Sequence, residues 1–156
     1  MTLSKEQLEQ IAQSPQAFLR QGRKINMRIA IKERRIQQLR RVSIQITTAP
    51  SEASAYTGPH DKVGKCVAKI VDLTQELGEE AEQLAGFQQL IGYAINTLIP
   101  DHALGAVIEA RYLAEMSWEE IAVSFHYAYR HVLRLHNKGL SVMQEEANEA
   151  LRRLDG

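Results

Sequence analysis

A chain of 156 residues with 44% hydrophobic residues is long enough to bury the core of one or two small domains, which favours a globular protein. Its 19 basic and 19 acidic residues leave a formal net charge of zero, so the bulk charge argues neither for nor against a polyanionic partner. Cys66 is the only cysteine, which excludes an internal disulfide, and no run approaches the roughly 18 apolar residues of a membrane span. Since the N-terminus does not resemble a secretion signal either, we expect a soluble cytoplasmic protein without membrane contact.

Helical periodicity is strong and strand signals are nearly absent, so we predict an all-α fold. Residues 1–46 are expected to form an N-terminal basic long helix, with nine basic residues between Arg20 and Arg41 against the single acidic Glu33. From Phe18 onward, an alternating spacing of four and three predicts one buried seam of mostly apolar residues. The seam consists of Phe18, Gly22, Ile25, Ile29, Lys32, Ile36, Leu39, Ser43 and Ile46.

Residues 47–60 contain Pro50, Gly58 and Pro59 and little periodicity, which predicts a linker loop. Residues 61–99 are expected to form a second long helix. Its predicted seam is Val63, Val67, Ile70, Thr74, Leu77, Ala81, Leu84, Gln88, Ile91, Ile95 and Leu98, with a track of small residues (Gly64, Val71, Gly78, Ala85, Gly92) on one side and Cys66, Leu73, Phe87 and Ala94 on the other. The glycines either admit another backbone or are accidental in a tolerant helix.

Across this linker, the two long helices can fold back into an antiparallel, coiled-coil-like hairpin. The basic helix would then lie beside the acidic stretch 72–82 of the second helix. The basic residues therefore have two interpretations: they pair with this acidic stretch, or they contact phosphate directly.

Residues 100–156 are predicted to form a helix-turn-helix domain with a C-terminal helix. Pro100 ends the preceding helix, Asp101 can cap the next one, and Ser117 with Glu120 forms a capping box that starts another. The inward positions expected of a helix-turn-helix are then filled in register by Ile121, Ala122, Phe125, Tyr127, Val132 and Leu135. Beyond Gly139, the last helix either continues or bends.

Two positions depart from the usual pattern of this motif. His126 occupies the turn where a glycine normally takes a left-handed backbone conformation, although His tolerates that conformation better than most residues. Ala128 opens the second helix where a Ser or Thr would cap it.

The second helix of this motif would expose a basic face that can read the major groove of double-stranded DNA. Arg130 and Arg134 could each grip a guanine or a phosphate, Asn137 could read adenine, and Lys138 could reach the backbone. The predicted DNA-binding set is Tyr129, Arg130, His131, Leu133, Arg134, Asn137 and Lys138. The alternative is a solvated basic face with no ligand.

Catalytic and metal chemistry find little support in the sequence. His126, His131 and His136 recur every five residues, which scatters them around a helix and prevents them from converging on one metal. We find no nucleophile with a base and no glycine-rich phosphate loop. We therefore expect neither an enzyme nor a cofactor.

The stretch ARYLAEMSWEEIAVSFHYAYRHVLRLHNKGL, residues 110–140, resembles the C-terminal part of phage and prophage transcriptional regulators of the ArpU/RinA type, whose helix-turn-helix is similar to region 4 of sigma-70 factors. DKVGKCVAKIVDL, residues 61–73, resembles a segment upstream of it, so the resemblance covers about residues 60–156. It implies a supporting helix that begins at Ser117 and a reading helix that contains Arg130, His131, Val132, Arg134, Leu135 and His136.

The resemblance implies a sequence-specific regulator that activates phage late genes in the cytoplasm of a bacterial host. The partner that it implies is promoter DNA, and host RNA polymerase is a further candidate. Because one such unit covers little DNA, we also expect a homodimer formed through the long helices. Two alternatives remain open: a small-terminase-like protein that assembles for DNA packaging, and a coiled-coil interaction module without a DNA role.

Overall fold

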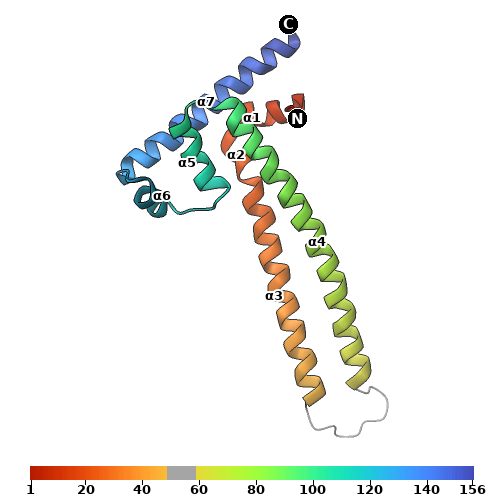
Figure 1. Ribbon diagram of the computed structural model, residues 1–156. Helices are drawn as coiled ribbons and strands as arrows, with labels where there is room; N and C mark the ends of the chain where they lie inside the picture. The colour runs from red at the N-terminus through yellow and green to blue at the C-terminus, as the bar shows by residue number, and fades with distance from the viewer. Residues whose placement is uncertain (49–58) are drawn as a thin grey trace. The chain divides into compact units, whose positions relative to one another are not determined.

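The computed structural model describes residues 1–48 and 59–156, and every regular element in these ranges is an α-helix (Figure 1). The predicted all-α fold is thus confirmed for these residues, and no helix among them is both long enough and apolar enough to cross a membrane. The chain divides into two compact units, residues 25–84 and residues 1–24 with 85–156. The helices are α1 (Lys5–Gln13), α2 (Pro15–Leu19), α3 (Gln21–Thr48), α4 (Pro59–Leu98), α5 (His102–Tyr112), α6 (Trp118–Phe125) and α7 (Tyr129–Asp155).

The prediction of one long helix over residues 1–46 is wrong at its N-terminal end, where α1 and α2 precede α3. The Ser4 hydroxyl caps α1 and forms a capping box with Gln7. Pro15 then disfavours a helical backbone at the residue before it, and Ser14 is extended, with φ −158° and ψ 100°. Because the Ser14 hydroxyl also accepts a hydrogen bond from the Ala17 amide, the chain stops one helix and starts another at the same residue.

The linker predicted over residues 47–60 overlaps the neighbouring helices at both of its ends. Residues 47 and 48 are the last of α3, and residues 59 and 60 are the first of α4. Residues 49–58 lie outside the described part of the chain. The second long helix begins two residues earlier and ends one residue earlier than the predicted range 61–99.

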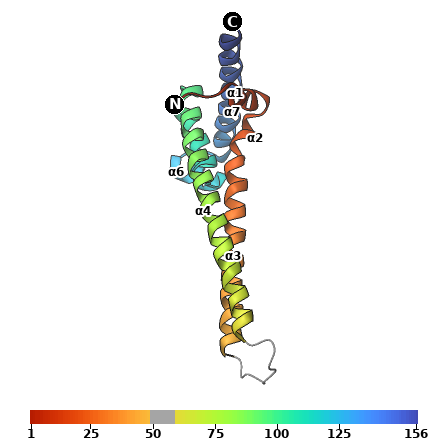
Figure 2. The same ribbon diagram turned by 90° about the vertical axis from the view of Figure 1, so that its right-hand side faces the viewer.

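In the unit formed by residues 25–84, α3 and α4 lie side by side and run in opposite directions, as Figures 1 and 2 both show. The seam predicted for α3 is confirmed here. Each of its positions in this unit is buried or half-buried: Ile25, Ile29, Lys32, Ile36, Leu39, Ser43 and Ile46.

The seam predicted for α4 is right at seven of its eleven positions. Ile91, Ile95 and Leu98 are buried and Val63, Ile70, Leu77 and Leu84 are half-buried, whereas Val67, Thr74, Ala81 and Gln88 are exposed. The inward flank of α4 instead carries Cys66, Leu73, Glu80, Phe87 and Ala94. The flank with Leu73 and Phe87 offers more apolar surface than the flank with Thr74 and Gln88, so burying it is more favourable.

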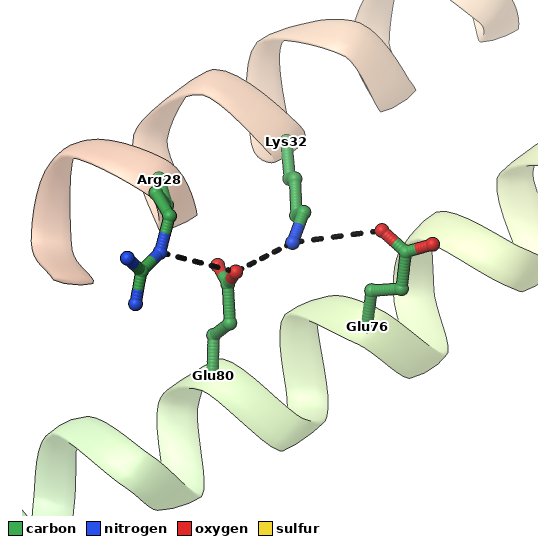
Figure 3. A network of polar contacts seen from close by, with 4 residues as sticks. All are labelled: Arg28, Lys32, Glu76 and Glu80. Atoms are coloured by element: carbon green, nitrogen blue, oxygen red, sulfur yellow. Dashed lines mark hydrogen bonds and ion pairs between the residues drawn. The ribbon is translucent and has the colours of Figure 1, made fainter.

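A group of ion pairs joins the two helices of this unit (Figure 3). Lys32 Nζ lies 2.6 Å from Glu80 Oε1 and 3.5 Å from Glu76 Oε2, and Arg28 Nε lies 3.4 Å from the same Glu80 oxygen. The hydrogen bond to Glu80 is the main cause that raises the pKa of Lys32. Because Lys32 lies on the seam of α3 and Glu80 on the inward flank of α4, their pairing favours one register of the two helices over shifted ones.

The other unit has a core to which both ends of the chain contribute. Leu8 and Ile11 of α1 and Leu19 of α2 pack in one cluster with residues of α4, α5 and α7, which include Ile91, Ile95, Ile108, Met143 and Ala147. The Gln144 side chain on α7 donates a hydrogen bond of 2.8 Å to the Ala12 carbonyl oxygen. The sequence analysis predicted a separate domain over residues 100–156. In the structure these residues share one compact unit with residues 1–24, which complete their core.

At Gly139, α7 passes close to α5. The helix neither ends nor bends into a new element there, since α7 is continuous from Tyr129 to Asp155. A Cβ atom at residue 139 would lie 3.0 Å from Ile108 Cγ1, so the missing side chain is what permits this approach.

Candidate nucleic-acid interface

α6 begins where the sequence predicted, at a capping box. The Ser117 hydroxyl accepts a hydrogen bond of 3.2 Å from the Glu120 amide, and the Glu120 carboxylate accepts one of 3.0 Å from the Ser117 amide. Two amides that the first turn would leave unpaired are thus satisfied, and this fixes the start of α6.

The turn between α6 and α7 has the backbone predicted for it. His126 is left-handed, with φ 57° and ψ 40°, and the Tyr127 amide donates back to the Ala122 carbonyl oxygen at 3.0 Å. Ala128 is the N-cap of α7 and makes no side-chain capping bond. The backbone therefore accommodates His126 in the turn, whereas α7 begins without a side-chain cap at Ala128.

A small apolar cluster holds α5, α6 and α7 together. Its fully buried members are Val107, Ile121 and Val132, and Ala110 is nearly so. All six residues predicted to point inward belong to this cluster: Ile121, Ala122, Phe125, Tyr127, Val132 and Leu135. The predicted packing register is therefore confirmed, and it determines which side of α7 faces away from the core.

The outward side of α7 carries the predicted DNA-binding residues. Tyr129, Arg130, Arg134, Asn137 and Lys138 are exposed, while His131 and Leu133 are half-buried. Arg130 and Arg134 are one helical turn apart, and no acidic residue lies between residues 127 and 140. None of the ion pairs among the described residues involves Arg130, Arg134 or Lys138, so their charges are free for a ligand.

The seven predicted residues are not equally available. His131 packs the edge of its ring against Tyr127, with ring centroids 5.0 Å apart. The Asn137 carbonyl oxygen accepts a hydrogen bond of 3.2 Å from His136 Nδ1, which leaves its amide group as a donor. A contact from Asn137 to both adenine edge atoms would therefore use the second lone pair of this oxygen and the free amide group.

His136 is a structural residue, a role that the spacing of the three histidines did not predict. It is 4% exposed, and its Nε2 lies 2.8 Å from the Tyr112 hydroxyl on α5. A neutral ring with the proton on Nδ1 satisfies both neighbours, because Nδ1 donates to Asn137 and Nε2 accepts from Tyr112. Although the family resemblance includes His136 in the reading helix, its burial excludes it from a DNA contact.

The surroundings of His136 favour this neutral form. Burial is the main cause that lowers its pKa, and the nearby positive charges of Arg111 and Arg20 lower it further, against the hydrogen bond to Asn137. Burial raises the pKa of Tyr112, so the hydroxyl keeps the proton that it donates. One signal in the sequence could have revealed the role of His136: it stands four residues after Val132 and three before Gly139, on the inward stripe of α7.

The basic run of α3 divides into paired and unpaired residues. Arg28 and Lys32 pair with acidic residues of α4, which supports the first of the two interpretations for these two side chains. Arg34, Arg35, Arg40 and Arg41 are exposed and take part in none of the ion pairs of residues 1–48 and 59–156.

In comparisons with known proteins, no family model, no curated protein and no solved structure matches this chain. Any assignment of function therefore depends on the geometry of the site and on the resemblance described above.

Proposed function

We propose that this chain is a sequence-specific regulator of transcription that binds double-stranded DNA through a helix-turn-helix formed by α6 and α7. The observation that carries the proposal is the outward face of α7, with Arg130 and Arg134 one turn apart and without neutralising acids. A helix with this face fits the major groove, where Arg can donate two hydrogen bonds to a guanine edge.

Rigid support of this face is the second argument. The cluster around Ile121 and Val132 fixes α7 against α5 and α6, and the hydrogen bonds of His136 tie it to Tyr112. A reading helix must be held in a fixed position, because a small displacement of the helix breaks its contacts with the bases. The packing therefore supports a role in recognition rather than a merely solvated basic helix.

The resemblance to regulators of the ArpU/RinA type supports the same function and extends it. On this basis we propose that the target is promoter DNA of phage late genes, that the motif is of the sigma-70 region 4 kind, and that host RNA polymerase is a candidate second partner.

We further propose that a second copy of this chain covers an uncovered stripe of α4. Gly64, Val67, Val71 and Gly78 lie on one face of the helix, and both valines are exposed, at 49% and 59%. No atom of the unit approaches within 4 Å of a Cβ built on either glycine. Val71→Lys should then shift the protein from dimer to monomer in sedimentation velocity, whereas Gln83→Lys, on another exposed face, should not.

A gel-shift titration with duplex DNA tests the assignment of α7. Arg130→Ala and Arg134→Ala should each weaken specific binding by about 1–3 kcal/mol, or roughly 5- to 150-fold in Kd, if they read bases. Arg152→Ala is a control that removes an exposed charge, paired with Glu149, from the far end of the same helix. Unchanged affinity for both variants would overturn the assignment.

The strongest alternative is a small-terminase-like protein that assembles on DNA for packaging. The uncovered stripe of α4 is compatible with such an assembly as well as with a dimer. Light scattering separates the two, because a ring of many subunits would favour packaging and a dimer would favour regulation. A coiled-coil module without a DNA role predicts negligible affinity for any duplex at low salt.

A further inference from the structure

The unit of residues 1–24 and 85–156 contains a cavity of about 150 Å³ beside the start of α6. It lies where the C-terminal end of α2 and the first turn of α3 meet the end of α5. Its main lining residues are Arg20, Arg23, Arg111, Tyr112, Glu115 and Trp118.

The charge of this cavity is strongly positive. Three guanidinium groups line it against the single carboxylate of Glu115. Within the described ranges, no ion pair includes Arg20, Arg23 or Arg111. Like charges gathered in a concave site without counter-charges attract an anion.

Arg111 is held in place before any ligand arrives. Its Nη1 donates a hydrogen bond of 3.0 Å to the Met116 carbonyl oxygen, and its guanidinium stacks over the Trp118 ring at 4.2 Å from the centroid. The remaining guanidinium donors keep a fixed orientation, which lowers the entropy cost of binding an anion. This distinguishes Arg111 from a solvated surface arginine.

The volume of the cavity limits what it can hold. Pockets that enclose drug-sized ligands measure about 300–1,000 Å³. A cavity of 150 Å³ is too small for a whole nucleotide, but it has room for one tetrahedral oxyanion. Arginine provides several donors in a planar fork, which is the arrangement that phosphate oxygens match.

We propose that this cavity binds a phosphate group through Arg20, Arg23 and Arg111. The phosphate can come from the backbone of duplex DNA or from a free phosphorylated molecule. The first source rests on the proposed function, because the cavity would then grip the backbone beside the groove that α7 reads. The second source does not depend on it.

Inorganic phosphate is the first probe, titrated at constant ionic strength against chloride. Since Trp118 is the only tryptophan and lines the cavity, the fluorescence and the indole N–H signal of the protein come from a ring at this site. We expect a saturable change with phosphate in the wild type and at least a tenfold weaker response in Arg20→Gln/Arg23→Gln. Arg152→Gln/Arg153→Gln is the charge-matched control and should respond as the wild type does.

Duplex DNA is the second probe and identifies the source. If the DNA backbone enters the cavity, the slope of the logarithm of the DNA-binding constant against the logarithm of the salt concentration should become shallower in Arg20→Gln/Arg23→Gln. The change should be about one unit per lost phosphate contact, and the control should show none. An unchanged slope with lost phosphate binding assigns the site to a free phosphorylated molecule. Phosphate binding in a protein that binds no DNA would refute the proposed function and leave this inference standing.

Two results would overturn the inference. One is a Trp118 response to phosphate no larger than that to chloride, together with equal salt slopes for the double variant and its control. The other is saturable phosphate binding that the double variant retains. Far-UV circular dichroism verifies that the variants are folded, which we expect because Arg20 and Arg23 are exposed.

Discussion

Replacement of His126 by glycine should stabilise the protein. His126 has a left-handed backbone, with φ 57°, which costs an L-residue about 1–2 kcal/mol. Glycine avoids this cost but loses roughly 0.5–1 kcal/mol more conformational entropy on folding. Because the His126 side chain is exposed, its removal sacrifices little packing. The difference between the centres of these two ranges predicts a gain of about 0.75 kcal/mol in the free energy of unfolding.

Urea unfolding followed by Trp118 fluorescence measures this gain, because Trp118 is the first residue of α6 and reports on the unit that contains the turn. His131→Gly is the matched control. The same substitution in the first turn of α7 should cost about 1 kcal/mol, since glycine is a poorer helix former than histidine and the contact with the Tyr127 ring is lost. If His126→Gly is no more stable than the wild type while His131→Gly is destabilised, the argument from backbone strain is wrong.

Three other substitutions test the packing around the proposed reading helix. Ser117→Ala removes the capping bond of α6 and should cost about 1 kcal/mol in urea unfolding, whereas exposed Ser124→Ala should cost less than half of that. Ile121→Ala empties a fully buried site and should cost about 2–4 kcal/mol, against less than 0.5 kcal/mol for exposed Val123→Ala; equal losses would contradict the assigned core. His136 has a lowered pKa in the folded protein, so the folded state binds fewer protons than the unfolded one. The free energy of unfolding should therefore keep the whole contribution of His136 above about pH 6.5 and decrease as the pH drops below that value. In His136→Gln this decrease should be smaller, and a pH profile identical to that of the wild type would refute the role of His136.

Local chemistry made much of the proposed interface predictable from the sequence. Caps at Asp101 and Ser117 depend on side chains within three residues of the amides that they satisfy. The inward register of Ile121 and Val132 follows from helical periodicity. The left-handed turn at His126 follows from the spacing between the inward residues of α6 and those of α7. Such features need no information from distant parts of the chain.

Features that depend on distant contacts were not predictable in the same way. α4 offered two possible seams, and the choice between Cys66 and Val67, or between Leu73 and Thr74, depends on the surface that α3 presents as well as on the apolar surface of each flank. The contact between α1 and α7 joins residues more than a hundred positions apart, and neither helix alone indicates its partner. For His136, the buried position was readable, but the Tyr112 hydroxyl that satisfies it was not.

Selection of bound sequences from a random pool of DNA duplexes tests the central proposal most directly. If α7 reads the major groove, the wild-type protein should enrich a defined motif, and Arg130→Ala or Arg134→Ala should each relax the preference at particular positions of that motif while Arg152→Ala preserves it. Enrichment of no motif by a folded wild-type protein, or the same motif with the same preferences in all variants, would contradict the assignment of α7 as a reading helix.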